Sequence, residues 1–412
     1  MMYRRTDRLY DVGELPEPGV LPEFMHAWCL RSDNLGEPER AFREEIVPVP
    51  SPGAGEVIVA NMSAGINYNG VWAALGKPKN VVANNGTYSD EKQDFHICGS
   101  EASGIVYAVG EGVENVRVGD RVIVGASQYD RDCPIVRAGG DPVSSPTYRV
   151  WGYEGNWGAF AQFCKVMDYQ CRSFPECLSW SEAASFTAAG AAVYRMLTRW
   201  PPNNVKAGDV VLVYGGTGGV GSMAIQLAKH FGAIPVAVVS DDERGEFCKT
   251  LGAAGYINRR NFRHWGRLGD YTNDEVQRKW SVEAARFRRE IWKIVGSKHS
   301  PDIVIEHPGA DTLPTSLFVC APGGMVVLCG ATSSYHADID LRFLWLNQKR
   351  IQGSHSATPE DYKEYVKIIE SSGIRPFIGR HFEWSQLPEA HQLLFEGKAP
   401  TGKLVIDIVK GV

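Results

Sequence analysis

The chain of 412 residues predicts an α/β protein in which a doubly wound parallel sheet accompanies a second, β-rich domain. The apolar run 210–214 is followed by glycines and then by apolar residues at three-to-four spacing, which is typical of a buried parallel strand, a tight turn and a helix. From residue 206 onward strands and helices alternate, whereas short strands separated by Gly and Pro turns fill the first half.

The glycine-rich turn after residue 214 is typical of a dinucleotide-binding site. Glycines let the backbone turn sharply and approach a pyrophosphate, and the following helix start offers unpaired N–H groups and a positive dipole end. A tight strand-to-helix turn without a ligand has the same pattern, so the alternative stays open. The residues expected to contact a cofactor here are Gly215, Gly216, Thr217, Gly218, Gly219 and Val220.

A second apolar run, Ile234–Val239, ends about twenty residues past the glycines, where a Rossmann-type unit places the residue that contacts the adenosine ribose. That residue is Ser240, and Arg244 follows it. A hydroxyl beside a guanidinium suits a 2′-phosphate, which Arg binds bidentately, so we predict NADPH with Arg244 and Arg259 as phosphate ligands. Two intervening aspartates leave a solvated helix start as the alternative.

The composition excludes several classes of function. A net charge of −5 and a pI near 6.1 argue against a nucleic-acid partner. No apolar run reaches the ~18–20 residues that span a bilayer, and the first residues lack a signal-peptide core, so we expect no membrane partner and a cytoplasmic location. The nine cysteines are scattered without the paired spacings of a zinc site, so no metal is expected.

The expected strands divide the chain into two domains. Strands at 27–30, 56–62, 104–109 and 121–124 predict a small barrel, and strands at 210–214, 234–239, 302–306 and 324–329 predict the parallel sheet. We therefore expect a substrate domain at 1–195, completed by 355–412 with its last strand near 404–409, and a cofactor domain at 196–354 with a polar insertion near 258–300. Cys329 ends a strand at the ligand-binding edge, and His307 is expected to shape the cofactor cleft.

Over nearly its whole length the chain resembles the medium-chain dehydrogenase/reductase superfamily. The resemblance is carried by Glu114–Val124, an Ala-rich helix near 183–196 and the glycine turn. It implies a GroES-like first domain. Zinc-dependent members carry Gly-His-Glu where this chain reads Gly99-Ser100-Glu101, so the resemblance is to the zinc-free, quinone-reductase-like branch, whose reactions add hydride to activated carbon–carbon double bonds.

Four separated motifs narrow the resemblance to the crotonyl-CoA carboxylase/reductase family. They are Gly65–Trp72, Trp151–Glu154 leading to Gly158–Ala161, Glu306–Gly309, and Leu344–Arg350 leading to Gly353–His355. The resemblance implies a CO2 pocket formed by Asn69, Tyr153, Glu154 and His355. Taken singly, Asn69 also fits a turn residue and His355 a hydrogen-bonded structural imidazole.

The chemistry of the implied reaction suits these residue types. Hydride addition to the β-carbon of an enoyl thioester leaves an enolate, which takes a proton or attacks CO2. CO2 has no net charge, so donors aimed at its oxygens must hold it, and Asn69 and His355 supply donors. Glu154 is better suited to anchor a water or the backbone, and exclusion of bulk water favours carboxylation over protonation.

Two further positions concern the acyl-CoA. Arg342 lies where the family places a cation for the CoA adenosine phosphates, although a solvated helix surface is the alternative. Ser356-Ala357-Thr358 stands where many members read Phe-Ala-Asn, which predicts a larger acyl site.

The expected function is NADPH-dependent reductive carboxylation of a 2-enoyl-CoA, either crotonyl-CoA or a longer or branched homologue, with CO2 to a 2-alkylmalonyl-CoA. The first alternative is a non-carboxylating enoyl-thioester or quinone reductase. The second is a non-catalytic NADPH-binding protein, because a fold alone does not fix an activity. The branch also implies a homodimer or homotetramer, whose cofactor domains pair sheet edge to sheet edge.

Overall fold

The structure is a computed structural model that describes residues 3–84 and 93–409. The chain divides into two compact units, Met1–Ala191 with Ser356–Val412, and Ala192–His355. Among the described residues, no helix combines the length and the apolar character needed to cross a membrane.

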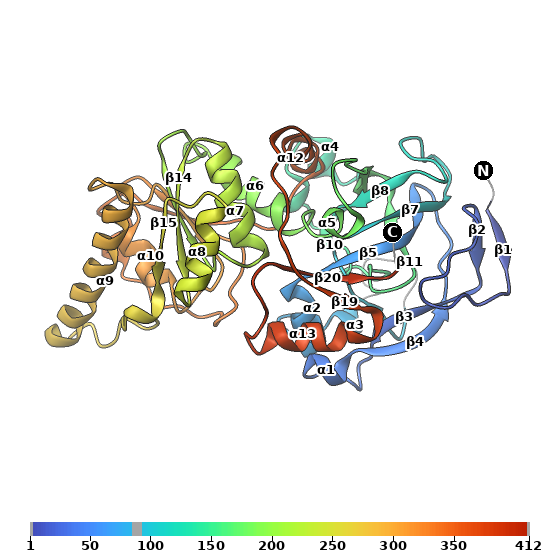
Figure 1. The fold of residues 1–412 in the computed structure, drawn as a ribbon, viewed down its shortest axis with the longest axis horizontal. Helices are drawn as coiled ribbons and strands as arrows, with labels where there is room; N and C mark the ends of the chain where they lie inside the picture. Colours follow the sequence, from blue (N-terminus) through green and yellow to red (C-terminus); the bar gives the residue numbers. More distant parts are fainter. Residues whose placement is uncertain (1–2, 85–92, 410–412) are drawn as a thin grey trace. The chain divides into compact units, whose positions relative to one another are not determined.

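The second unit is built on a six-stranded parallel sheet (Figure 1). The first strand of this sheet in the sequence, β13, lies in its middle, and the next strands run outward to one edge. The chain then returns to the middle with β16, and the following strands run to the other edge. Such a reversal is where doubly wound sheets bind ligands. In spatial order the strands are β15 (Gly255–Asn258), β14 (Ile234–Val239), β13 (Val210–Tyr214), β16 (Ile303–Glu306), β17 (Met325–Leu328) and β18 (Arg350–Gly353).

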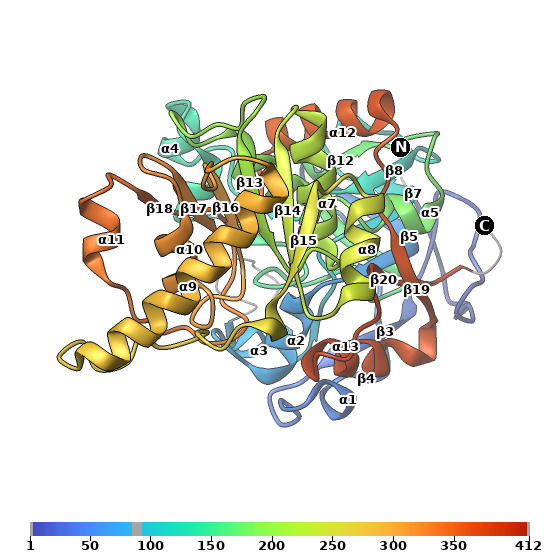
Figure 2. The ribbon, with the colours of Figure 1, turned by 60° about the vertical axis from the view of Figure 1, so that its left-hand side comes forward.

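Helices cover both faces of this sheet, with α7 (Gly219–His230) and α8 (Asp242–Thr250) on one face and α9 (Asp274–Val295) and α10 (Leu313–Val319) on the other (Figure 1). The short helix α11 (Leu341–Trp345) precedes the edge strand β18, and Figure 2 shows it at that edge.

The segment near 258–300, expected as an insertion, forms the crossover from β15 to β16. Its helix α9 has buried side chains at helical spacing, which pack over β14 and β15. The many charges of this segment lie between those positions, which is why its composition suggested an insertion. The buried residues are Trp280, Ala284, Phe287 and Ile291.

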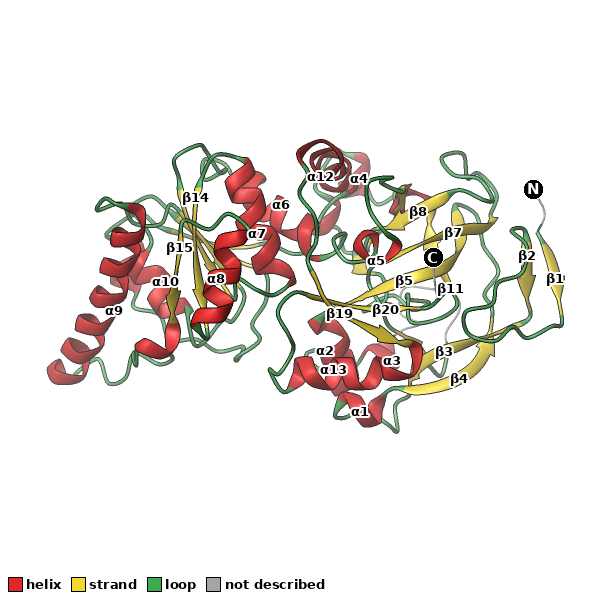
Figure 3. Ribbon diagram, viewed as in Figure 1, coloured by secondary structure: helices red, strands yellow, loops and turns green. Residues whose placement is uncertain are grey.

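The first unit is a β-rich barrel (Figure 3). Its main sheet has seven strands, and β20 of the C-terminal segment pairs with β5 there, so this segment completes the barrel. The strands of the main sheet are β5 (Glu56–Ile66), β7 (Ala102–Val109), β8 (Arg121–Val124), β11 (Phe163–Met167), β12 (Cys171–Ser173), β19 (Ile378–Glu383) and β20 (Lys403–Asp407). A three-stranded sheet contains β4 (Arg43–Pro48), β3 (Phe24–Leu30) and β6 (His96–Ile97), and two small pairs join β1 (Arg4–Thr6) to β2 (Val20–Pro22) and β9 (Ser127–Gln128) to β10 (Arg149–Val150).

The single helix expected near 183–196 is wrong, because two helices, α5 (Trp180–Ala183) and α6 (Ala189–Thr198), occupy this stretch. Between them the amide of Ala188 donates to Glu101 Oε2 at 2.8 Å, and Thr187 Oγ1 donates to the carbonyl of Val124 at 2.9 Å. A continuous helix would direct the Ala188 amide to a carbonyl four residues earlier instead. Most of α6 belongs to the second unit, which begins at Ala192. Besides α5, the helices of the first unit are α1 (Pro38–Ala41), α2 (Tyr68–Leu75), α3 (Val81–Asn84), α4 (Pro134–Arg137), α12 (Pro359–Ser372) and α13 (Leu387–Phe395).

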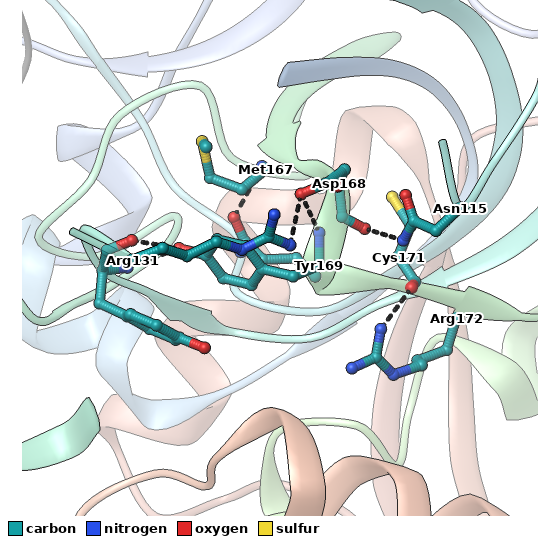
Figure 4. A network of polar contacts seen from close by, with 9 residues as sticks. Asn115, Arg131, Met167, Asp168, Tyr169, Cys171 and Arg172 are labelled. Carbon is teal, nitrogen blue, oxygen red and sulfur yellow. Dashed lines mark hydrogen bonds and ion pairs between the residues drawn. The ribbon is translucent and has the colours of Figure 1, made fainter. Parts of the chain in front are cut away.

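A polar network attaches the loop after β9 to the turn between β11 and β12 (Figure 4). Asp168 Oδ1 accepts a hydrogen bond from Arg131 Nη2 at 2.7 Å, and Tyr169 Oη donates to the carbonyl of Tyr129 at 2.6 Å. Because β9 pairs with β10, and β10 leads directly to Tyr153, the network fixes the base of one loop of the candidate site.

Candidate active site

Asn69 lies in the first turn of α2, and its Nδ2 donates to Ser100 Oγ at 2.6 Å. Ser100 is buried. An amide nitrogen has two hydrogens, so Asn69 keeps a second N–H for another acceptor. The helix itself packs closely on α13, since a Cβ at Gly70 would lie 2.4 Å from His391 Nε2.

The Tyr153–Glu154 loop packs against the turn that carries Ser100. Gly152 has a φ of +68°, and a Cβ there would lie 1.9 Å from the carbonyl oxygen of Gly99, so this approach requires glycine. The backbone thus brings the Tyr153 loop next to Ser100, the hydrogen-bond partner of Asn69. The Tyr153 ring is buried.

Both carboxylate oxygens of Glu154 are engaged within the protein. Oε2 accepts a hydrogen bond from the amide of Val150 at 3.0 Å, and Oε1 forms an ion pair with Lys79. Glu154 therefore anchors its own loop to β10 and to the segment that follows α2.

A buried ion pair fixes the start of α2. Lys403 of β20 pairs with Glu101 and also donates to Asn67 Oδ1, and Asn67 Nδ2 donates to Glu101 Oε1 at 2.8 Å. Lys403 and Glu101 are 5% and 0% exposed, so their hydrogen bonds must offset a large desolvation cost. The network attaches the C-terminal strand to the residues immediately before Asn69.

His355 is exposed and is the last residue of the second unit, whereas Asn69, Tyr153 and Glu154 belong to the first. Ser356, where the first unit resumes, has a φ of +49° and lies with its Oγ 3.3 Å from Ser127 Oγ. Ser127 also bonds the carbonyl of Ala357, so the segment after His355 is attached to β9.

In the second unit, residues 215–218 form a tight turn between β13 and α7, and we call this turn together with the first helical residues, up to Gly221, the cofactor turn. Gly215 has a φ of +59°, and the amide of Gly218 donates back to its carbonyl at 3.0 Å. A Cβ at Gly221 would lie 2.2 Å from the carbonyl oxygen of Gly215. The glycines therefore let the turn pack tightly against the start of α7, an arrangement typical of pyrophosphate sites. The residues predicted to contact a cofactor lie in this turn and at the start of α7: Gly215, Gly216, Thr217, Gly218, Gly219 and Val220.

Ser240 and Asp241 follow β14 at the same edge of the sheet. Asp241 Oδ1 accepts from the amide of Arg244 at 2.9 Å, and its Oδ2 accepts from Ser240 Oγ at 2.9 Å and lies 3.4 Å from Arg244 Nε. These contacts, the Arg244 amide first, hold the pKa of Asp241 below its usual range, and the charge of Arg260 adds to the effect. The acid is thus engaged by protein groups.

Arg260 is a cation that sequence reasoning missed. Val239 and Asn258 are paired at the ends of β14 and β15, so the residues after them lie at the same edge. Arg259, predicted as a ligand, is exposed, and its carbonyl accepts from Trp265 Nε1 at 2.9 Å. Sequence alone does not distinguish these neighbouring arginines.

Two more residues predicted from the sequence, Arg342 and Cys329, contact protein groups close to them in the fold. Arg342 has a 62% exposed side chain and forms a two-pronged ion pair with Asp340. The amide of Cys329 donates to the carbonyl of Glu306 at 3.1 Å, and burial raises the pKa of its thiol to about 12. Within residues 3–84 and 93–409, no group of three or more His, Cys, Asp or Glu side chains is placed to hold a metal ion.

The parallel sheet with its cofactor turn and the barrel together define a medium-chain dehydrogenase/reductase. Residues 53–176 match the family described as alcohol dehydrogenase GroES-like domain, and residues 219–371 match the family described as zinc-binding dehydrogenase. The chain is 41% identical to the crotonyl-CoA carboxylase/reductase of Cereibacter sphaeroides, over 97% of this chain and 91% of that relative. It belongs to the crotonyl-CoA carboxylase/reductase family.

Two solved structures are similar over nearly the whole chain. The crotonyl-CoA carboxylase/reductase AntE in complex with NADP is 47% identical with a TM-score of 0.92, covering 97% of this chain and 98% of that one. The 2-octenoyl-CoA carboxylase reductase CinF, in complex with NADP and 2-octenoyl-CoA, is 31% identical with a TM-score of 0.86, covering 95% and 89%. These comparisons confirm the predicted fold class, family and nicotinamide cofactor.

Proposed function

We propose that this chain catalyses the reductive carboxylation of a 2-enoyl-CoA with CO2, giving a 2-alkylmalonyl-CoA. The observation that carries the proposal is the convergence of Asn69, through Ser100, on the loop that holds Tyr153 and Glu154. A donor amide close to a loop that carries a buried aromatic residue suits a neutral, linear molecule with two oxygen acceptors.

The cofactor turn and the residues after β14 fit NADPH. The cradle at Gly215 and Gly221 receives the pyrophosphate, and Ser240 with Arg244 and Arg260 receives the 2′-phosphate. When bound, NADPH supplies the hydride that reduces the enoyl double bond. Arg259, His307 and Cys329 lie at the same edge of the sheet and complete the proposed cofactor site.

The remaining proposed residues act on the substrate. Asn69 and His355 donate hydrogen bonds to the oxygens of CO2, which makes its carbon more electrophilic and stabilises the new carboxylate. Tyr153 covers the pocket against water, and Glu154 holds the loop in place through Val150 and Lys79. Arg342, on the exposed surface of α11, binds the adenosine phosphates of CoA.

Two alternatives have the same fold. A quinone or enoyl-thioester reductase would oxidise NADPH without CO2, and a non-catalytic NADPH-binding protein would not oxidise it at all. NADPH oxidation is therefore followed with crotonyl-CoA, with 2-octenoyl-CoA and with a quinone, each with and without bicarbonate and carbonic anhydrase. Our proposal requires oxidation that depends on the enoyl-CoA and is accelerated by CO2; oxidation with the quinone alone contradicts it.

We also propose that the protein is a homo-oligomer joined at the edge of the parallel sheet. The edge strand β18 is preceded by α11, where Leu341 and Trp345 are 61% and 60% exposed, and Leu346 directly after this helix is 67% exposed. An open sheet edge beside exposed apolar side chains favours pairing with a second copy. Sedimentation should show a dimer or tetramer that Trp345→Asp dissociates, and a monomeric unmodified protein contradicts this.

We place the protein in the cytoplasm. Its nine cysteines are free thiols in the structure, and all but Cys177 are at least partly shielded from solvent. This usage of cysteine is typical of a reducing compartment.

A further inference from the structure

Glu306, the last residue of β16, is a fully buried carboxyl group that the proposed reaction does not use. Its Oε1 accepts hydrogen bonds from the amide of Gly309 at 3.1 Å and from Thr312 Oγ1 at 2.6 Å. Its Oε2 accepts one from Ser316 Oγ at 2.5 Å. Because Thr312 and Ser316 are also buried, at the start of α10, the carboxyl group ties the turn 306–309 to that helix from inside the unit.

The next residue, His307, contacts the cofactor turn. Its Nε2 lies 3.0 Å from the carbonyl oxygen of Tyr214, and because a carbonyl only accepts, this nitrogen carries the proton and donates. A Cβ at Gly215 would lie 2.9 Å from the same ring. Burial lowers the pKa of His307, which keeps the ring neutral. The imidazole therefore fixes the backbone immediately before the glycines.

The contact lies at the reversal point of the sheet. Tyr214 ends β13 and Glu306 ends β16, and these adjacent strands begin the two halves of the doubly wound sheet. Ligands of such sheets bind just beyond this point. Any movement of the turn 306–309 would therefore shift the backbone at the place where we propose that the pyrophosphate binds.

We propose that Glu306 is a positioning residue for NADPH, which acts through His307 to hold Gly215 in the conformation that receives the pyrophosphate. The inference rests on the proposed cofactor site, but it requires neither the enoyl-CoA nor CO2. The carboxyl group holds the turn, the turn holds the imidazole, and the imidazole holds the Tyr214 carbonyl.

The same geometry links cofactor binding to pH. Burial raises the pKa of Glu306 to about 7, opposed by hydrogen bonds from Ser316, Thr312 and the amides of Gly309 and His307. The titratable groups that face it are Tyr214 and Cys329, whose own pKa values are raised by burial, and neutral His307. All three are uncharged at neutral pH, so the charge of Glu306 has no counter-ion among them.

The neutral form of Glu306 keeps the network intact. Ser316 Oγ lies 3.0 Å from the carbonyl of Thr312 as well, so a protonated Glu306 donates to Ser316, whose hydroxyl then donates to that carbonyl. An anionic cofactor nearby disfavours the ionised carboxylate, so NADPH binding should favour the neutral form. The affinity for NADPH should therefore fall as the pH rises through about 7.

Glu306→Gln tests the proposal without emptying the site, because Gln has the same shape and no charge. The dissociation constant of NADPH is measured by fluorescence titration from pH 6 to pH 8.5, without enoyl-CoA. The cofactor's own 2′-phosphate titrates equally in both proteins, so the ratio of the two constants isolates Glu306. We expect the unmodified protein to lose about tenfold in affinity relative to the variant, which corresponds to about one pKa unit. Parallel profiles overturn the link to pH.

Glu306→Ala tests the positioning role itself. It leaves the Gly309 amide and the Thr312 hydroxyl without their acceptor, so we expect the Michaelis constant for NADPH to rise about tenfold or more while kcat at saturating NADPH changes little. Glu306→Gln should restore most of this affinity at pH 6. Thr315→Val is the matched control on the same helix and should bind NADPH as the unmodified protein does. A folded Ala variant with unchanged NADPH affinity, or a Gln variant as weak as Ala, overturns the proposal.

Failure of this inference is distinguishable from failure of the proposed function. NADPH that binds with the expected dependence on Glu306, in a protein that forms no carboxylated product, leaves the inference standing and removes the carboxylase. If the protein forms the carboxylated product but its NADPH affinity does not change with substitution of Glu306, the proposed function stands and this inference is wrong.

Discussion

Asn69 Nδ2 lies 2.6 Å from Ser100 Oγ, so this buried serine is the hydrogen-bond partner of the proposed CO2-binding amide. The short hydroxyl group therefore orients the amide of Asn69.

Asn69→Leu should shift the product from carboxylated to saturated acyl-CoA, because it removes a preorganised donor to developing negative charge. Such a loss costs on the order of 3 kcal/mol, or about a hundredfold in partition. Ser100→Ala keeps the amide and removes only its partner, so about a tenfold shift is expected. Product ratios by mass spectrometry measure both variants. An unchanged ratio in Asn69→Leu, with NADPH binding intact, removes Asn69 from the site.

Arg244→Ala and Arg260→Ala should each weaken the binding of NADPH without weakening the binding of NADH. The loss of one charge-assisted contact to the 2′-phosphate costs about 1.5–3 kcal/mol, which is a rise of more than about tenfold in the Michaelis constant for NADPH. Arg259→Ala is measured beside them, because Arg259 is the phosphate ligand predicted from the sequence. Its effect on the Michaelis constant for NADPH is compared with that of Arg260→Ala, since the charge of Arg260 acts on Asp241. Equal use of NADPH and NADH by the unmodified protein is the result that this account does not permit.

Ser356→Phe should reduce the specificity constant for long or branched enoyl-CoAs relative to crotonyl-CoA. A ring at this position, whose present hydroxyl lies 3.3 Å from Ser127 Oγ, would narrow the proposed acyl site, and each methylene in an apolar pocket is worth roughly 1–3 kcal/mol. Ser356→Ala, which removes the hydroxyl without filling the space, is the control. A sharp fall in specificity beyond four carbons in the unmodified enzyme counts against a larger acyl site.

Acid should destabilise both units through buried histidines. Burial lowers the pKa of His96 to about 3 and of His264 and His391 to about 4, from an ordinary value of 6.5. Between pH 6.5 and pH 4 these histidines bind protons in the unfolded chain but stay neutral in the folded one. Their contribution to the free energy of unfolding is therefore complete above pH 6.5 and is lost as the pH falls toward 4. Each histidine contributes on the order of 3 kcal/mol across that range.

Calorimetry at pH 7.5 and pH 5 measures the effect. The fall in Tm should be smaller in His391→Leu than in the unmodified protein, and exposed His336→Leu is the control in which the fall is unchanged. A fall in Tm that is as large in His391→Leu as in the unmodified protein would show that His391 does not contribute to this pH dependence.

Glu306 acts in the opposite direction over a similar range. Its folded pKa of about 7 exceeds the ordinary 4.5, so its stabilising contribution is complete below pH 4.5 and is lost as the pH rises through 7. Glu306→Gln should therefore gain stability relative to the unmodified protein between pH 5 and pH 8, by up to about 3 kcal/mol. Urea unfolding of both proteins at the two pH values tests the sign, which an unchanged difference in free energy would contradict.

The parts that follow from local pattern could be predicted from the sequence. The runs 210–214 and 234–239 are strands with those bounds, because a strand buried on both faces reads as a continuous apolar run. The glycine turn was equally clear, since Gly215 and Gly221 have no room for a Cβ.

The parts that depend on tertiary contact could not be predicted. The helix α9 was obscured because only every third or fourth residue is buried in a charged segment. The break between α5 and α6 depends on Glu101, which is far away in sequence. The contact of Gly152 with Gly99 likewise joins residues that are distant in the sequence. The role of Glu306 depends on two hydroxyl groups of α10, which look like ordinary helix residues in the sequence.

Reductive carboxylation is tested most directly by the product formed from an enoyl-CoA, NADPH and ¹³C-labelled bicarbonate with carbonic anhydrase, identified by mass spectrometry. We expect mainly the carboxylated acyl-CoA with one ¹³C, and slower turnover to saturated acyl-CoA when CO2 is omitted. If the unmodified protein forms only saturated acyl-CoA at every CO2 concentration, the carboxylase assignment is wrong and the chain is a simple enoyl-CoA reductase.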